Sequence, residues 1–186
     1  TTITPSVKYK TSSVKTDPKI SQQNYNKLLN LPTAQKKKKK NKVLVAVIDT
    51  GIDKNHPELK NKIVSSYNVH NPINASLPED HGTHVAGIIA AEKNSGIGGY
   101  GINPNASVLS IDVFNREWGA YDYNIAEGVL YAIKKKAKVI NLSLGGPFSS
   151  PVLESAIKKA KAAGIVIVAA AGNEGSDMKG YPAAYE

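Results

Sequence analysis

Hydrophobic and polar positions follow two alternating patterns along most of this chain. Runs rich in valine and isoleucine have the length of buried strands at residues 43–48, 107–113, 138–143 and 165–170. Between them, apolar residues recur at helical spacing at residues 81–92, 121–136 and 150–163. Strands that alternate with helices in this way predict an α/β fold, a three-layer parallel sheet with helices on both faces.

The first 41 residues lack this pattern. Residues 1–41 are predicted to form an amino-terminal arm with one short helix at about 21–31, and residues 42–186 a single unit. No window approaches the ~20 consecutive apolar residues of a membrane span, so no such span is predicted.

Candidate chemistry begins at the end of the first strand. Asp49 follows six apolar residues and precedes Thr50 and Gly51, which places it at the carboxyl end of a buried strand. Open α/β sheets bind their ligands at this edge, and a buried carboxylate needs partners there. A capping role without chemistry is the alternative for Asp49 considered alone.

His81 opens a helix of small apolar residues. A histidine there can be held by a carboxylate while its second nitrogen faces a substrate, which is the arrangement of a base and its orienting acid. His84, three residues on, is the competing candidate. The His-Gly-Thr-His spacing lacks the pattern of a two-histidine zinc site, so His84 is predicted to be a packed core histidine.

Two later strands also end in residues with potential functions. Val139 to Leu144 is followed by Gly145 and Gly146, whose bare backbone suits pairing with an extended peptide. The strand at 165–170 leads to Asn173, whose amide can donate to a developing oxyanion. Each segment considered alone is also compatible with a simple turn.

Together these segments resemble the subtilisin-like serine proteases, the subtilases. The motifs are V-A-V-I-D-T-G-I-D with H-P-E-L, H-G-T-H-V-A-G, V-I-N-L-S-L-G-G and A-A-A-G-N-E-G, in family order, between about Lys42 and Glu186. The resemblance implies that Asp49 is the triad acid, His81 the general base and Asn173 the oxyanion donor. It also implies a set of substrate-binding residues, namely Phe114, Ile125, Ser143, Leu144, Gly145, Gly146, Ala170, Ala171 and Gly172.

The family's nucleophile is absent from this sequence. Subtilases carry it in a G-T-S-x-A motif, and these 186 residues contain neither that motif nor G-x-S-x-G. The fold is therefore expected to be incomplete in this chain, with the catalytic serine on a carboxyl-terminal remainder. A serine endopeptidase that acts on peptides or proteins is the predicted function, and a non-catalytic, peptide- or partner-binding relative is the alternative.

A calcium ion is a further expectation from the resemblance. Many subtilases bind one in the loop that corresponds to residues 92–101, and Glu58 and Asn94 supply oxygens of the type calcium prefers. The loop carries one residue more than the common pattern, and the family's usual acid is shorter than Glu58. A glycine-rich turn without a metal is the alternative.

Composition adds limits rather than a function. The chain has no cysteine and a net charge of +9, much of it from the lysine-rich stretches at residues 36–42 and 134–136. The first stretch lacks interleaved aromatic residues and is interpreted as a solvated loop, so no nucleic-acid partner is predicted. The second closes a predicted helix, where cations favour the carboxyl end. The protein is expected to be secreted or to lie at the cell surface, and to be of a bacterial type.

Overall fold

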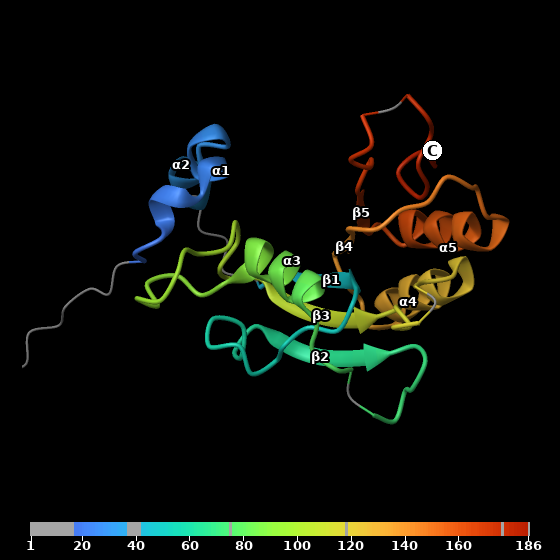
Figure 1. Cartoon of the computed structure of the whole chain (residues 1–186), viewed down its shortest axis with the longest axis horizontal. Coiled ribbons are helices and arrows are strands. Elements are labelled where there is room, and N and C mark those ends of the chain that lie inside the picture. The colour runs from blue at the N-terminus through green and yellow to red at the C-terminus, as the bar shows by residue number, and fades with distance from the viewer. Residues whose placement is uncertain (1–16, 37–41, 75, 118, 176, 186) are drawn as a thin grey trace, which may run out of the picture.

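The computed structural model describes residues 17–36, 42–74, 76–117, 119–175 and 177–185. The strands are β1 (Leu44–Asp49), β2 (Ile63–Asn68), β3 (Ser107–Asp112), β4 (Val139–Leu142) and β5 (Val166–Ala169). The helices are α1 (Asn24–Leu28), α2 (Leu31–Lys36), α3 (Asp80–Ala90), α4 (Asp122–Lys134) and α5 (Pro151–Ala162), with a 3-10 turn, η1, at Ile20–Gln22. Figure 1 shows their arrangement.

The strands form a parallel sheet in the order β2-β3-β1-β4-β5. After β1 the chain adds strands on one side, and after β3 it crosses to the other side of β1. The carboxyl ends of β1, β3 and β4 therefore meet where the order reverses, which is the usual ligand edge of an open α/β sheet. This topology places the end of β1 at the centre of that edge.

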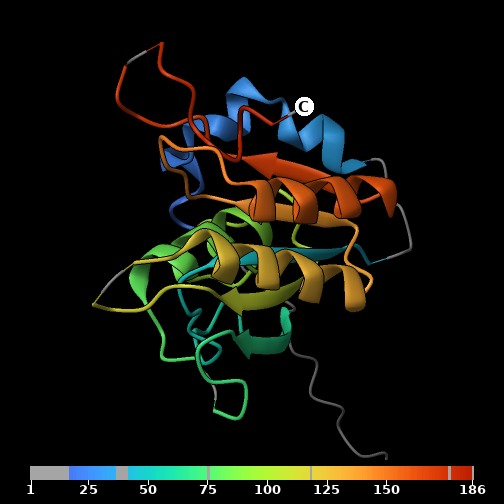
Figure 2. The same ribbon diagram turned by 90° about the vertical axis from the view of Figure 1, so that its right-hand side faces the viewer.

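Helices cover both faces of the sheet, which confirms the predicted three-layer α/β fold (Figures 1 and 2). Helix α3 buries Ala86 and Ala90 against Val45 and Val47 of β1. Helices α4 and α5 pack on the opposite face, where the alternate β1 residues Ala46 and Ile48 point. None of the helices in the described ranges combines the length and apolarity needed to cross a membrane.

Two parts of the chain differ from the prediction. Strand β2 was not predicted; it pairs only with β3, shifts register between Ile63 and Ser65, and exposes every second residue of its first half. An edge strand of this kind lacks the continuous apolar run that marks the central strands. The predicted arm helix at 21–31 is three short segments instead, and Asn30 adopts a left-handed conformation (φ 48°) between α1 and α2.

Candidate active site

Asp49 and His81 meet at the carboxyl edge of the sheet. Asp49 is fully buried, and its Oδ1 lies 2.7 Å from Nδ1 of His81. The same oxygen accepts the backbone N–H of Thr50 at 2.7 Å. The His81 side chain is 60% exposed, so its ring is held at one nitrogen and is open to solvent elsewhere. A buried acceptor of this kind fixes the orientation of the imidazole.

Gly82 allows this contact to form. Its backbone N–H donates to Thr50 Oγ1 at 2.9 Å, which joins the first turn of α3 to the end of β1. A Cβ atom at Gly82 would lie 2.4 Å from the Thr50 carbonyl oxygen, closer than real Cβ contacts come. Only glycine lets the helix start this close to the strand, and this closeness places His81 beside Asp49.

Replacing Gly82 with alanine is expected to lower both stability and activity. The added methyl group must push α3 away from Thr50, and overpacking of this kind costs about 1–3 kcal/mol. Thermal unfolding and kcat/KM measured on the full-length protein check it. Gly82→Val should be worse than Gly82→Ala, and an alanine variant with unchanged melting temperature and activity would contradict the proposed packing.

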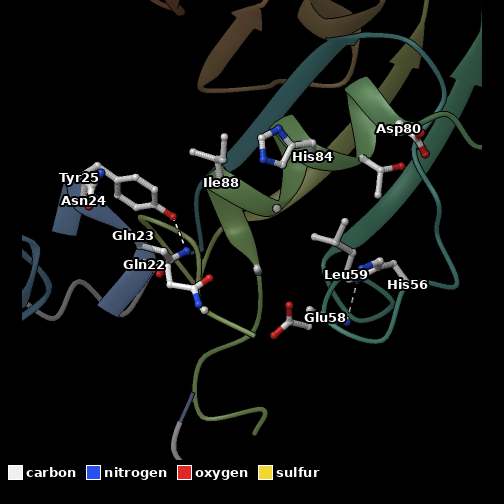
Figure 3. A pocket seen from close by; sticks show the side chains of 14 residues that line it. Gln22, Gln23, Asn24, Tyr25, His56, Glu58, Leu59, Asp80, His84 and Ile88 are labelled. Carbon is white, nitrogen blue, oxygen red and sulfur yellow. Dashed lines mark hydrogen bonds between the residues drawn. The ribbon is translucent and has the colours of Figure 1, made fainter. Parts of the chain in front are cut away.

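His84 is not the core histidine that the sequence predicted. It is exposed, because the sheet-facing positions of α3 are Gly82, Ala86 and Ala90, and His84 lies on another face of the helix. There it lines a groove of about 730 Å³ together with residues of α1 and of the loop after β1 (Figure 3). Across the described ranges, no group of three or more His, Cys, Asp or Glu side chains could hold a metal ion.

The segments predicted to form the walls of the specificity pocket lie side by side. Backbone N–H of Ala170 donates to the Leu142 carbonyl at 3.0 Å, which brings residues 170–172 beside residues 143–146. Gly146 does not have the bare backbone that was expected, because it exchanges hydrogen bonds of 2.9 and 2.8 Å with Tyr181. Backbone available for a substrate at this edge is therefore on the Ser143–Gly145 side.

Asn173 lies in an exposed turn after β5. Gly172 adopts φ 102°, a region that favours glycine, and the backbone N–H of Asn173 donates to Glu174 Oε2 at 2.7 Å. This local bond holds the turn through the backbone of Asn173 and does not use its side-chain amide. Asn173 is exposed and follows the carboxyl end of β5, at the same edge of the sheet as Asp49.

The two predicted apolar subsite residues differ in exposure. Phe114 is half-buried and can meet a bound peptide, whereas Ile125 is only 8% exposed and belongs to the core between the sheet and α4. A substrate therefore has access to Phe114 more readily than to Ile125.

Asp112 is a second buried carboxylate at this edge, and the sequence did not single it out. It is the register partner of Asp49 across β1 and β3. Burial raises the pKa of Asp112, and the Glu79 carboxylate adds to that rise; the hydrogen bond from Phe114 N opposes it. Its signal in the sequence was an acid at the end of the second predicted strand, the position that Asp49 has in the first.

Asp112→Asn is expected to raise the melting temperature at neutral pH. A raised pKa means that the folded protein binds this proton more tightly than the unfolded chain, so stability falls as pH rises above about 3.8, the ordinary value, through the folded pKa. Asparagine keeps an acceptor for Phe114 N and carries no charge. Melting curves should show a gain at pH 7 that disappears near pH 3; a gain independent of pH would contradict the assignment.

The loop after α3 is held by a carboxylate from the arm. Buried Asp17 accepts the backbone N–H groups of Asn94 at 2.7 Å, Ser95 at 2.8 Å and Gly96 at 3.3 Å. Glu58 Oε1 accepts from Ser95 Oγ at 2.7 Å. Two carboxylates thus converge on this loop, and carboxylate oxygens are of the type that calcium prefers.

Similarity to known proteins identifies the family of this chain. The Subtilase family profile matches residues 40–186. An intracellular serine protease of Paenibacillus polymyxa is 44% identical over 155 residues, covering 77% of this chain and 47% of that protein. Subtilisin E of Bacillus subtilis (strain 168) is 45% identical over 150 residues, covering 77% of this chain and 38% of that protein. The chain belongs to the subtilase family.

A solved protease structure also resembles this fold. A solved structure titled S41 Psychrophilic Protease matches with a TM-score of 0.70 and 34% identity, covering 76% of this chain and 50% of that chain. The chain spans about half or less of the length of the curated relatives it matches. The relative from Paenibacillus polymyxa is named a serine protease, and the solved structure is named a protease.

Proposed function

We propose that this chain supplies the acid, the base and an oxyanion donor of a serine endopeptidase. The observation that carries the proposal is the 2.7 Å contact between buried Asp49 and exposed His81. Asp49 orients the imidazole and stabilises its positive charge, and the other ring nitrogen faces the substrate. Asn173 donates to the oxyanion from the loop after β5, at the same edge of the sheet.

The nucleophile in this proposal is a serine outside these 186 residues. Ser143, a serine at the predicted site, does not fit the role, because its Oγ accepts a hydrogen bond from Asn141 Nδ2 at 3.0 Å and so contacts an amide rather than a histidine. The lengths of the relatives allow a further segment of similar size.

The reaction follows from these roles. The serine Oγ attacks the scissile carbonyl carbon while His81 takes its proton, and the carbonyl oxygen becomes an oxyanion that receives the Asn173 amide N–H. His81 then gives that proton to the leaving amine as the C–N bond breaks. A water molecule, deprotonated by His81, hydrolyses the acyl-enzyme and regenerates the serine.

Two surfaces suit the segment that brings the serine. The groove along the outer face of α3 begins at Asp80 and Thr83, next to His81. Strand β5 forms an edge of the sheet, with Val166 58% and Val168 50% exposed. An unpaired edge with exposed valines is a template for a further strand, and we propose that the remainder adds to both surfaces.

The test compares the full-length protein with residues 1–186 alone. The full-length protein should hydrolyse a peptide substrate and lose activity with a serine-directed inhibitor, whereas residues 1–186 alone should not turn over substrate and should regain activity when the remainder is added. Turnover by residues 1–186 alone would overturn the assignment of an outside serine. A full-length protein that binds peptides without cleaving them would support the non-catalytic alternative.

We also propose a structural calcium ion at the loop of residues 92–101, held by Glu58 and Asn94 with Asp17 as an added oxygen source. A bound cation would offset the repulsion between the two carboxylates and tie the arm to the loop. Calcium should raise the melting temperature of the full-length protein, a chelator should lower it, and Glu58→Gln should reduce that difference. Equal melting temperatures with calcium and with chelator would exclude the site.

For location, we propose action outside the cell or at its surface. The support is the resemblance of the Asp17-Pro18 and Gln22-Gln23 region to the start of many secreted subtilases. One relative is named an intracellular protease, so fractionation of the producing bacterium is the test. Protein confined to the cytoplasm would contradict the proposal.

A further inference from the structure

A group of exposed lysines lies at the edge of the sheet opposite the candidate active site. We call this group the basic edge, and it consists of Lys134, Lys135, Lys136, Lys138, Lys159 and Lys161. These residues come from the end of α4, the turn that follows it, the approach to β4 and the last turn of α5.

The topology brings them together. Helices α4 and α5 both follow the carboxyl end of a strand and run back to the amino edge of the sheet, where they end side by side (Figure 2). Lys136 makes the turn after α4 with φ 59°. Two residues later the Lys138 carbonyl accepts the Val166 N–H at 3.0 Å, just past the end of α5. The charges therefore share one edge although they lie up to 27 residues apart in sequence, from 134 to 161.

These lysines are not neutralised within the described residues. In those ranges no recorded ion pair involves any of the six, and Lys135 instead lies over the Tyr131 ring at 5.2 Å. By contrast, buried Lys62 pairs with Glu92 at 2.8 Å. Lysines at a helix end also favour the helix dipole, but Lys136 and Lys138 lie beyond α4, where that effect has faded.

Acidic residues gather at the other edge. They follow the strands or begin the helices at the carboxyl edge: Asp49, Glu79, Asp80, Asp112, Asp122 and Glu174. The carboxyl edge thus carries exposed charges of both signs, since Lys54, Arg116 and Lys179 also lie in loops there, whereas the exposed charges of the basic edge are lysines. An anionic surface would therefore attract the basic edge more strongly than the edge that carries His81.

We propose that the basic edge docks the protein on a membrane rich in anionic phospholipid, with the active-site edge facing away from the lipid. Lysine ammonium groups act as mobile point charges that suit diffuse phosphate headgroups, and each one near such a surface strengthens binding about fivefold. Catalysis would then take place on substrates that approach from the aqueous side.

A nucleic acid fits the basic edge less well. The six residues include no arginine, which forms the bidentate contacts common at phosphates and guanine. The ring closest to them, Tyr131, is stacked on Tyr67 at 3.9 Å and covered by Lys135, so it is not free to stack on a base.

The experiment is co-sedimentation of the full-length protein with vesicles. The protein carries His81→Ala, which makes it inactive so that it does not degrade itself. Vesicles of phosphatidylglycerol mixed with phosphatidylcholine should bind it, and vesicles of phosphatidylcholine alone should not. The double change Lys134→Gln with Lys138→Gln should weaken binding about 25-fold, fivefold for each lysine. Salt at about 1 M, which shortens the Debye length to ~3 Å, should abolish binding.

Two controls separate a located surface from net charge. Lys54→Gln with Lys179→Gln removes the same charge from loops that follow β1 and β5. It should change binding less than about twofold, because the strands that separate the two edges are about 13–20 Å long, more than the Debye length of ~10 Å. Lys134→Arg with Lys138→Arg should bind like the parent protein. Equal losses in both glutamine pairs, binding to phosphatidylcholine alone, or tighter binding to duplex DNA than to the anionic vesicles at equal phosphate would each overturn the proposal.

Discussion

Replacing His81 with alanine in the full-length protein is expected to reduce kcat by about 10⁶-fold, the size of effect measured for the corresponding change in subtilisin. The variant leaves no group to take the proton from the serine, while the substrate-binding walls at residues 143–146 and 170–172 are unchanged. KM should therefore change little. Steady-state kinetics on a peptide substrate provide both constants.

His70→Ala is the matched control for that change. His70 is an exposed histidine after β2, and its Nε2 contacts the Val113 carbonyl at 3.1 Å rather than a carboxylate. It should retain activity within about tenfold of the parent protein. Asp49→Asn should lose about 10⁴-fold, because the amide no longer holds the imidazole in the right tautomer. Comparable losses in the His70 and His81 variants would contradict the assignment of the base.

Replacing Asn173 with leucine is expected to lower kcat by about 10²–10³-fold, again the size of effect measured in subtilisin. The amide donates to an oxygen that carries negative charge only in the transition state, so the ground-state complex loses little. Leucine is close in size, and the turn is held by Gly172 and by the backbone bond to Glu174 rather than by the amide. Kinetics that separate kcat from KM provide the measurement.

Asn105→Leu controls for a general effect of losing an exposed asparagine. Asn105 lies in the loop before β3, at the amino edge of the sheet. Its kinetic constants should match those of the parent protein. A loss in the Asn173 variant that appeared only in KM would show that Asn173 binds substrate instead of stabilising the oxyanion.

The central part of the fold was predictable because burial on both faces leaves a clear pattern. Strand β1 is a continuous apolar run up to Asp49, and the last five residues of β3 are buried although two of them are polar. The acid that ends β1 follows directly from that boundary. Strand β2 was missed because none of its residues is fully buried, Val64 and Ser66 face solvent, and it pairs only with β3. The arm was mispredicted because its short helices are set by contacts with a distant loop, such as the hydrogen bond from Gln23 Nε2 to the Tyr100 carbonyl.

At the site, local pattern predicted positions but not partners. Asp49 and His81 follow from a strand end and a helix start, whereas the burial of Asp17 beneath residues 94–96 joins segments about 77 residues apart. The orientation of His84 depended on which face of α3 meets the sheet. The pairing of Gly146 depended on Tyr181, which lies 35 positions further on. The lysine run at residues 37–40 lies outside the described residues.

The most direct test of the account is to identify the reactive serine chemically. The full-length protein is treated with a fluorophosphonate, digested and analysed by mass spectrometry, alongside the His81→Ala variant. One labelled serine outside residues 1–186 is expected, with no labelling in the variant, because the serine needs His81 to become nucleophilic. A label on a serine within these 186 residues, or labelling that is unchanged without His81, would contradict it.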